Sequence, residues 1–343
     1  MGSMSIQFTD SWMLGRLEVP NRVLLAPLAG IGNWFVRLQA KRYGAGMAVS
    51  EMVSSHAVHH RNEKTCTEML RIHQDEQATG PVSIQLFGED PAVMRSAATR
   101  VAAAGADAID LNMGCPVPKV CKTGAGAALL SDPDTAVAVA RAARQGSGLP
   151  VTVKLRSGRR SGEQNGFELA HRLVNEAGVA AIAFHPRSAA VHHKGTPDYE
   201  LVARLTQTLD APVILTGGLN DAKGIREAFD FTGATAVMLA RGALGNPWLF
   251  AQLVEDPARS RAGGLARAEV IAELHWTIDR AVEHLGAERA TRYLRKFYPW
   301  YITRLQLEKA SARRLQGSLQ AAPTLQQARD LLDAGRLPAV LAA

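Results

Sequence analysis

The chain has 343 residues, and 47% of them are hydrophobic, as in an ordinary soluble globular protein with a sizeable core. It has no apolar run of about 18 residues or more, which disfavours a membrane span, and its three cysteines cannot build a disulfide framework, which favours a reducing, cytoplasmic compartment. The net charge of +7 points to a polyanionic partner, and most of the excess lies in residues 260–343, where 13 Lys and Arg face 8 Asp and Glu.

The segment Met1-Gly-Ser-Met4 resembles a cloning remnant, and residues 1–15 are interpreted as this remnant followed by a short lead-in. Eight aliphatic segments then alternate with amphipathic, helix-like stretches. The predicted strands are 22–29, 47–53, 81–87, 108–112, 150–155, 180–185, 212–216 and 236–240. Asp90 and Asp132, each directly before a proline, and Asp221 mark helix starts.

Eight strand–helix units predict a closed (β/α)8 barrel, the TIM-barrel fold, over residues 16–257. The alternative is a doubly wound open sheet, which usually has fewer strands and a Gly-x-Gly-x-x-Gly turn after the first strand. The first turn here, Ala26-Pro-Leu-Ala-Gly30, lacks that pattern.

The pattern changes after residue 257. Residues 259–264 read as a linker, and 265–286, 288–316 and 324–334 show apolar residues at helical spacings without any strand signal. Residues 258–343 are therefore predicted to form a separate, small all-helical domain.

Polar side chains stand at or just past the ends of several predicted strands. They are Glu51, Gln85, Asn112, Cys115, Lys154 and His185. Barrel enzymes gather their catalytic groups at this end of the barrel, so these positions predict an active site. Each residue alone also has a structural explanation, such as a lysine whose ammonium group reaches solvent from a strand end.

The seventh and eighth turns contain small residues, Thr216-Gly217-Gly218 and Ala240-Arg241. Small residues let backbone N–H groups approach a phosphate, and the loops after strands 7 and 8 form the phosphate site of many barrels. We expect a phosphorylated cofactor or substrate here, with flavin mononucleotide (FMN) and phosphosugars as the main candidates. Lys154 and Gln85 would suit a flavin ring, and equally an enediolate or a Schiff base.

Cys115 ends a buried segment at Asp110-Leu-Asn-Met-Gly-Cys-Pro116, and a basic, glycine-rich loop with Lys119 and Lys122 follows. A thiol at its ordinary pKa suits a proton donor as well as a nucleophile, and the lysines could lower that pKa or hold the phosphates of a polyanion. No metal site is expected, because the adjacent pairs His59-His60 and His192-His193 do not give a recognised zinc spacing.

In the helical tail, Arg292, Arg295 and Lys296 are predicted to share one helical face next to a cluster of aromatic residues. This arrangement fits either a solvated face beside an aromatic core or a nucleic-acid surface in which charge positions phosphates.

Five segments together resemble the tRNA-dihydrouridine synthases, with the bacterial B type as the nearest match. They are Ala26-Pro-Leu-Ala-Gly30, Val49-Ser-Glu-Met52, Asp110-Leu-Asn-Met-Gly-Cys-Pro116, Val153-Lys-Leu-Arg156, and Arg241 with Asn246-Pro-Trp248. The resemblance runs from about residue 16 to about residue 302 and implies an enzyme that holds FMN and uses NADPH to reduce the C5–C6 double bond of D-loop uridines in tRNA. It also implies a cytoplasmic protein; we expect a monomer.

The resemblance assigns roles residue by residue. The cofactor would contact Pro27, Leu28, Ala29, Gln85, Lys154 and His185, with its phosphate on Thr216, Gly217, Gly218, Ala240 and Arg241. Cys115 would donate a proton to C5 of a uracil taken out of the RNA stack. Substrate contacts would come from Asn112, Lys119, Lys122, Arg187, Arg292, Arg295 and Lys296.

Three short segments depart from the family pattern. The usual Asn-Gly-Asp is Thr216-Gly217-Gly218, the usual Gly-Arg is Ala240-Arg241, and His-Gly-Arg-Thr has become His185-Pro-Arg-Ser188. All three lie on the cofactor side, so backbone contacts to a phosphate survive while the side chains of the missing Asn and Asp contribute nothing. Two other functions fit the residues: a small-molecule flavin oxidoreductase whose tail serves dimerisation, and a non-catalytic RNA-binding protein on a barrel scaffold.

Overall fold

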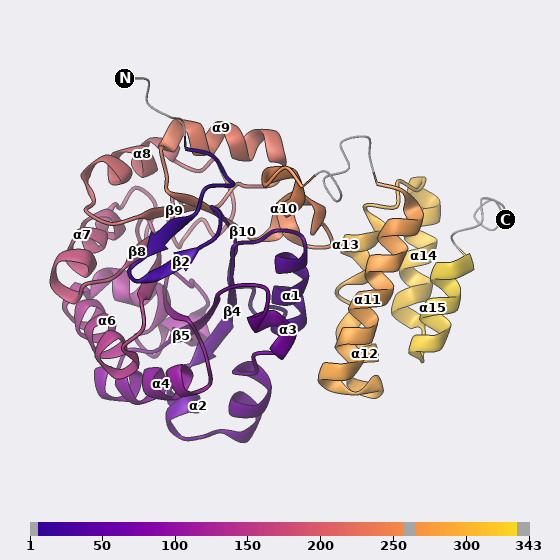
Figure 1. Cartoon of the computed structure of the whole chain (residues 1–343), viewed down its shortest axis with the longest axis horizontal. Coiled ribbons are helices and arrows are strands. Elements are labelled where there is room, and N and C mark those ends of the chain that lie inside the picture. Colours follow the sequence, from indigo (N-terminus) through magenta and orange to yellow (C-terminus); the bar gives the residue numbers. More distant parts are fainter. Residues whose placement is uncertain (1–5, 257–264, 335–343) are drawn as a thin grey trace.

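The computed structural model describes residues 6–256 and 265–334, and eight parallel strands form a closed barrel at its centre (Figure 1). The hydrogen-bonded order is β10-β3-β4-β5-β6-β7-β8-β9, with each strand beside its neighbour in sequence. The strands are β3 Val23–Leu25, β4 Met47–Ser54, β5 Val82–Phe87, β6 Ala108–Met113, β7 Val151–Arg156, β8 Ala181–His185, β9 Val213–Thr216 and β10 Ala236–Leu239. The predicted (β/α)8 barrel is confirmed.

Helices follow the strands and cover the outside of the barrel (Figure 1). They are α1 Trp34–Arg42, α2 Ser55–His59, α4 Pro91–Ala103, α6 Pro133–Ser147, α7 Asn165–Ala177, α8 Tyr199–Thr208, α9 Ala222–Thr232 and α10 Trp248–Leu253. Asp90, Asp132 and Asp221 each accept hydrogen bonds from backbone N–H groups in the first turns of α4, α6 and α9. The predicted helix starts are therefore confirmed, because each aspartate satisfies donors that the helix leaves unpaired.

Shorter elements complete the loops. They are α3 Gln74–Gln77, α5 Pro118–Cys121, a π-helix over Thr65–Met69, and 3-10 helices over Gly126–Ser131 and Arg241–Ala243.

A two-stranded hairpin precedes the barrel, with β1 Trp12–Leu14 paired to β2 Leu17–Val19. Its buried Trp12, Leu14 and Val19 pack with residues at the N-terminal ends of the barrel strands. The expected boundary after residue 15 falls inside this hairpin, so the lead-in belongs structurally to the barrel and closes the end opposite the predicted site. Residues 1–5 of the expected remnant lie outside the described residues.

In the described part of the tail, residues 265–334, the chain forms five helices. They are α11 Arg267–Leu285, α12 Ala287–Leu294, α13 Tyr298–Ile302, α14 Lys309–Ala321 and α15 Leu325–Ala334. The expected continuous segment 288–316 is divided at two turns, and Pro299 stands in the first turn of α13, the helical position that tolerates proline. The expected linker 259–264 and the boundary at 257–258 lie outside the described part of the chain.

The tail packs against the barrel through α11 and α1, and one hydrophobic core runs through both (Figure 1). Buried Glu273 of α11 accepts hydrogen bonds from Gln39 Nε2 of α1 and from Oη of Tyr43, the residue directly after α1, each at 2.8 Å. Gln39 Nε2 also donates to Tyr301 Oη at 2.8 Å. These buried bonds fix the orientation of the tail relative to the first barrel helix. Within the described residues, no helix is both long and apolar enough to cross a membrane.

Candidate active site

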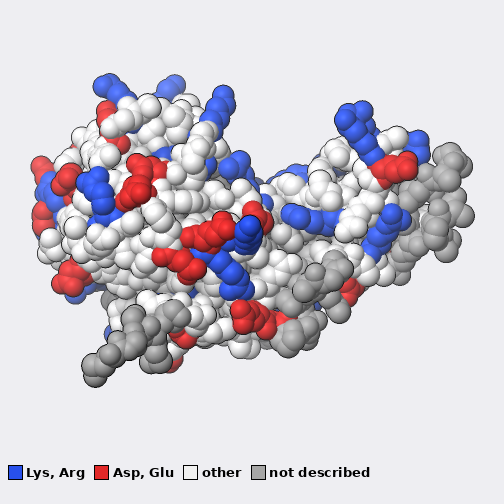
Figure 2. Space-filling view, turned by 90° about the horizontal axis from the view of Figure 1, so that it is seen from above, with Lys and Arg blue, Asp and Glu red and all other residues white. Residues whose placement is uncertain are grey.

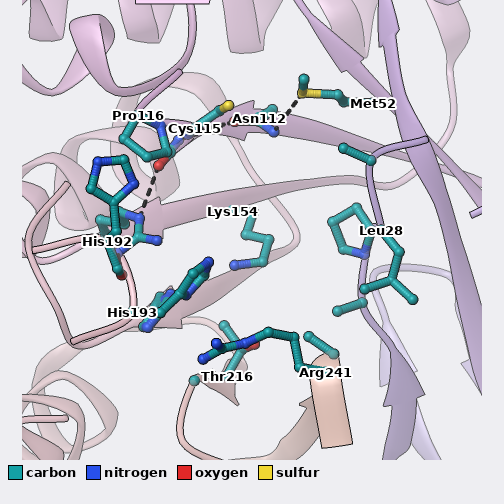
Figure 3. A pocket seen from close by; sticks show the side chains of 18 of the residues that line it. Leu28, Met52, Asn112, Cys115, Pro116, Lys154, His192, His193, Thr216 and Arg241 are labelled. Atoms are coloured by element: carbon teal, nitrogen blue, oxygen red, sulfur yellow. Dashed lines mark hydrogen bonds between the residues drawn. The ribbon is translucent and has the colours of Figure 1, made fainter. Parts of the chain in front are cut away.

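A cavity of about 350 Å³ lies at the C-terminal ends of the strands (Figure 3). It brings together every residue predicted to bind the cofactor. It also includes Asn112 and Cys115, at the end of β6 and in the turn that follows, which we call the cysteine corner. Together these residues are Pro27, Leu28, Ala29, Gln85, Asn112, Cys115, Lys154, His185, Thr216, Gly217, Gly218, Ala240 and Arg241. Lys154 lies between the wall formed by Asn112 and Cys115 and the wall formed by Thr216 and Arg241 (Figure 3).

A chain of hydrogen bonds from the buried interior of the barrel fixes the cysteine corner. Asp110, fully buried on β6, accepts from Gln85 Nε2 at 2.6 Å and from the Thr152 hydroxyl. The Gln85 Oε1 atom then accepts from Asn112 Nδ2 at 3.0 Å. Asn112 Oδ1 accepts from the backbone N–H groups of Gly114 at 3.2 Å and Cys115 at 2.9 Å. One buried carboxylate thus sets the orientation of both amides and of the turn that carries the thiol.

Strand register explains this alignment. Gln85, Asp110 and Thr152 stand opposite one another on the adjacent strands β5, β6 and β7, and Asn112 stands opposite Lys154. Because side chains alternate across a strand, positions two residues apart share the interior face, which places Asp110 beneath Asn112.

The Cys115 thiol is half-buried, and burial raises its pKa, while a hydrogen bond from the Val117 N–H and the nearby Arg156 and Lys154 oppose the rise. The thiol is therefore protonated at neutral pH, the state that a proton donor requires. The lysines of the following loop do not determine this pKa. Cys121 donates to the Cys115 carbonyl oxygen at 3.3 Å, and both are free thiols.

The charges of the buried Asp110 and the partly buried Lys154 stabilise each other. Burial raises the pKa of Asp110 to about 6 and lowers that of Lys154 to about 8. Hydrogen bonds from Thr152 and Gln85 and the charge of Lys154 oppose the rise at Asp110, while Arg156 adds to the fall at Lys154. Between these two values the carboxylate and the ammonium coexist, so the cavity holds a cation that can stabilise negative charge on a bound ring.

His185 ends β8, and burial together with nearby Lys154, Arg156 and Arg187 strongly lowers its pKa, so the imidazole is neutral. Arg187 is itself buried; its guanidinium donates to the Gly195 carbonyl oxygen at 2.7 Å and lies 3.4 Å from His185 Nε2. Arg187, which is predicted to contact the substrate, thus lies beside His185 and the 188–198 loop and does not line the cavity.

Glycines shape the end of the cavity that is predicted to hold a phosphate. Gly217 and Gly218 have φ of +96° and +85°, a region that favours glycine. A Cβ on Gly217 would collide with the His185 ring, and one on Gly218 would lie 2.6 Å from the Tyr199 hydroxyl. Gly242 likewise lets the β10 loop contact the carbonyl oxygen of Leu219 in the β9 loop. This glycine-lined floor beside the Arg241 guanidinium fits a phosphate and an attached planar ring.

Other predicted substrate residues lie outside the cavity lining. Lys119 and Lys122 are exposed on and directly after the short helix α5, which begins next to the cavity-lining residues Pro116 and Val117. Gly126, at φ +62°, packs against the Cys115 carbonyl oxygen, so this basic loop is tied to the cysteine turn.

The three tail cations do not share one helical face as predicted, because α12 ends at Leu294 and the next residues form a turn. Exposed Arg292 pairs with Glu288 at 2.8 Å, four residues earlier. Arg295 is also exposed. Lys296 points back to the barrel, where its Nζ donates to the Gly30 carbonyl oxygen at 2.6 Å.

Some cavity residues were not among the predicted site residues: Met52, Arg156, His192 and His193. Arg156 could have been found, because it stands two residues after Lys154 on the same strand and so shares its face. It donates to the backbone carbonyls of Gly114, Ser188 and His192 and thereby links three loops. The two histidines lie in an irregular loop, for which sequence periodicity gives no signal. The described residues contain no cluster of three or more His, Cys, Asp or Glu that could hold a metal.

Comparison with known proteins gives a consistent result. A family model described as dihydrouridine synthase matches residues 24–334. The chain is 34% identical over 299 residues to tRNA-dihydrouridine synthase B of Pseudomonas aeruginosa, covering 85% of this chain and 87% of that protein. It is 33% identical over 312 residues to the protein of that name from Vibrio parahaemolyticus, covering 90% and 95%.

Solved structures share the barrel. Morphinone reductase in complex with tetrahydroNAD matches with a TM-score of 0.54 at 17% identity, covering 74% of this chain and 91% of that chain. A 2-naphthoyl-CoA reductase matches with a TM-score of 0.58 at 13% identity, covering 73% of this chain and 52% of that chain. At these identities the likeness concerns the fold alone.

Proposed function

This chain belongs to the dihydrouridine synthase family, and from this premise we propose that it is a flavin-dependent tRNA-dihydrouridine synthase. It reduces the C5–C6 double bond of a D-loop uridine in tRNA, with FMN as the bound cofactor and NADPH as the reductant. The protein acts in the cytoplasm and as a monomer. The observation that carries the proposal is the presence in one cavity of the Cys115 thiol, the Lys154 ammonium group and a glycine-lined floor next to Arg241.

The residues present fit FMN. Gly217 and Gly218 leave room where any side chain would collide, and Arg241 supplies positive charge at the same end. Lys154 and Gln85 would hold the polar edge of the ring, and Pro27 and Leu28 its apolar part. When bound, FMN supplies the hydride that reaches C6 of the uracil.

The cysteine corner supplies the proton. Cys115 Sγ–H donates to C5 of the uracil, and the raised pKa of its thiol keeps the proton available at neutral pH. Asn112 Nδ2 donates to Gln85 Oε1 at 3.0 Å and to the weak acceptor Met52 Sδ at 3.7 Å. A bound uracil carbonyl oxygen would replace the thioether sulfur as the second acceptor. The uracil must leave the RNA stack to reach this position, which costs a few kcal/mol.

The remaining cations hold the tRNA. Lys119 and Lys122 closely follow cavity-lining residues in the chain, while Arg292 and Arg295 are exposed on the tail. Exposed cations position phosphates without reading sequence, so they set where the D-loop lies relative to the cavity.

Dihydrouridine mapping in cells tests this function. We expect tRNA from a strain that lacks this gene to lose dihydrouridine at defined D-loop positions, and a plasmid with the wild-type gene to restore it. The Cys115→Ala gene should not restore it, although the protein accumulates and binds FMN. Full dihydrouridine content in the deletion strain, with reduction of free uracil or an enone by the purified protein, would instead establish a small-molecule oxidoreductase. A protein that does not take up FMN would establish a non-catalytic RNA-binding role.

A further inference from the structure

The loop between β3 and α1, residues 26–33, forms one wall of the cavity. Ala26, Pro27, Leu28 and Ala29 line the cavity directly. The chain then turns at Gly30, whose φ is +74°. Both Ile31 and Gly32 donate their N–H groups to the Leu28 carbonyl oxygen, at 3.1 and 2.7 Å. A shift of the backbone at Gly30 would therefore also shift Leu28 and Ala29, which face the cavity.

The barrel holds this loop through Glu51, in the second half of β4. Its Oε2 accepts from the Gly30 N–H at 2.8 Å, and its own N–H donates to the Gly32 carbonyl oxygen at 3.0 Å. Gly32 has to be glycine here, because a Cβ would lie 2.7 Å from the Glu51 nitrogen.

The tail holds the same loop through Lys296. Its Nζ donates to the Gly30 carbonyl oxygen at 2.6 Å and lies 3.8 Å from the centre of the Tyr293 ring, a cation–π contact. The Tyr293 hydroxyl in turn accepts from Asn33 Nδ2, at the far end of the loop, at 2.6 Å. The charges of Glu51 and Lys296 also stabilise each other.

We propose that Glu51 and Lys296 form a clamp on Gly30 that positions the cofactor wall, so that docking of the tail sets the affinity of the cavity for FMN. Lys296 is then a positioning residue for the cofactor rather than a contact for RNA phosphates. The inference rests on the proposed flavin-dependent function, because FMN is the ligand whose affinity the clamp changes. A wall built from loop residues keeps its geometry only when supporting contacts fix it, and these bonds are that support.

Substitution of Lys296 by Met tests the clamp, because Met keeps the length of the side chain and removes its charge and donor. In the full-length protein without RNA, we expect Lys296→Met to weaken FMN binding roughly tenfold, as loss of a charge-assisted hydrogen bond implies. Fluorescence titration of FMN into the cofactor-free protein measures this. Hydrogen exchange of the cofactor-free protein should also show severalfold faster exchange in peptides that cover residues 26–33.

Two matched variants separate the clamp from general loosening. Arg289 on α12 bridges the tail to Glu68 of the barrel at 2.8 Å and does not touch the loop, so Arg289→Met should leave FMN binding unchanged. Glu51→Gln keeps an oxygen that can accept from the Gly30 N–H, and should change FMN binding less than Lys296→Met.

The clamp is refuted if Lys296→Met binds FMN like the wild type with unchanged hydrogen exchange in residues 26–33. If the wild type binds no FMN, the proposed function fails, and the exchange comparison still decides whether the clamp exists.

Discussion

Asp110 is the residue on which the order of the cysteine corner depends. It accepts two hydrogen bonds in full burial, and the amides of Gln85 and Asn112 take their orientation from it. An asparagine at this position would direct its NH₂ group at either Gln85 Nε2 or the Thr152 hydroxyl, and both of these groups donate to Asp110 in the wild type. Since a buried polar group without a partner costs about 1–3 kcal/mol, the chain of bonds would rearrange.

We expect Asp110→Asn to weaken FMN binding roughly tenfold at pH 7.5, because Gln85 loses its fixed acceptor. The wild type should also lose affinity for FMN as the pH falls through about 6, because the raised pKa of Asp110 means that the carboxylate takes up a proton there. The protonated group can no longer accept from Gln85 and Thr152 at the same time. Asp110→Asn should lack this step. Flavin titrations from pH 5 to pH 8 measure both effects.

The cofactor phosphate titrates in the same range in every variant, so the difference between wild type and variant is the readout. Thr152→Val is the matched control. It removes a hydrogen bond that lowers the pKa of Asp110, and so should move the step to higher pH rather than abolish it. Identical pH profiles for wild type and Asp110→Asn would contradict the role of Asp110.

The sequence marked residues that line the cavity where a polar group ended a predicted strand. It gave no signal for residues whose contacts form only in the folded chain. Cys115 and Lys154 stood out because a polar group ended an aliphatic segment. Asp110, in the same motif, read as part of a buried strand, and its partner Thr152 lies 42 residues away in the chain. The engagement of Lys296 with Gly30, 266 residues apart, has no local signal at all.

At the scale of elements, the loops after β9 and β10 have room for the proposed cofactor phosphate only because glycines stand where side chains would collide. Gly217 is the strictest position, since it combines φ of +96° with a collision between any Cβ and the His185 ring. The departures from the family pattern keep this glycine, so the backbone shape of the loop is retained while its polar side chains have changed.

Replacement of Gly217 by Ala should weaken FMN binding roughly tenfold or more, because overpacking costs about 1–3 kcal/mol and His185 must move from the cavity wall. Gly148→Ala is the control: Gly148 also has positive φ, at +64°, but a Cβ at this position would have no other atom within 4 Å. It should lose about 1 kcal/mol of stability without any change in FMN affinity. Thermal unfolding and flavin titration of both variants measure this. Equal FMN affinities in the two variants would show that the glycine floor does not shape the cavity.

The elements themselves were predictable, and their ends less so. Alternating aliphatic and amphipathic segments gave all eight barrel strands, and the aspartate caps gave helix starts, because both signals are local. The N-terminal hairpin was missed, since two strands of three residues carry too little periodicity. The break at Leu294 was missed because basic residues continue the helical spacing through a turn.

At the scale of the whole molecule, the tail is both a part of the barrel core and a charged surface. On the face seen in Figure 2, Lys and Arg predominate over the tail, whereas acidic and basic side chains are interspersed over the barrel. The buried Glu273 bonds and the Lys296 contact fix this surface relative to the cavity. A fixed distance between the cavity and the basic surface suits a substrate as large as tRNA, because the contacts that bind the tRNA phosphates lie far from the uracil atom that reacts.

Reduction of an unmodified tRNA transcript by the purified protein tests the central claim most directly. The wild type, supplied with FMN and NADPH, should add two hydrogen atoms to a uridine of the D-loop, detected by mass spectrometry of nuclease fragments. Cys115→Ala should bind FMN with unchanged affinity and lose the product by about 100-fold or more, as expected for removal of a general acid. Product formation by Cys115→Ala at the wild-type rate would contradict the assignment of the proton donor, and no product from the flavin-loaded wild type would contradict the proposed function.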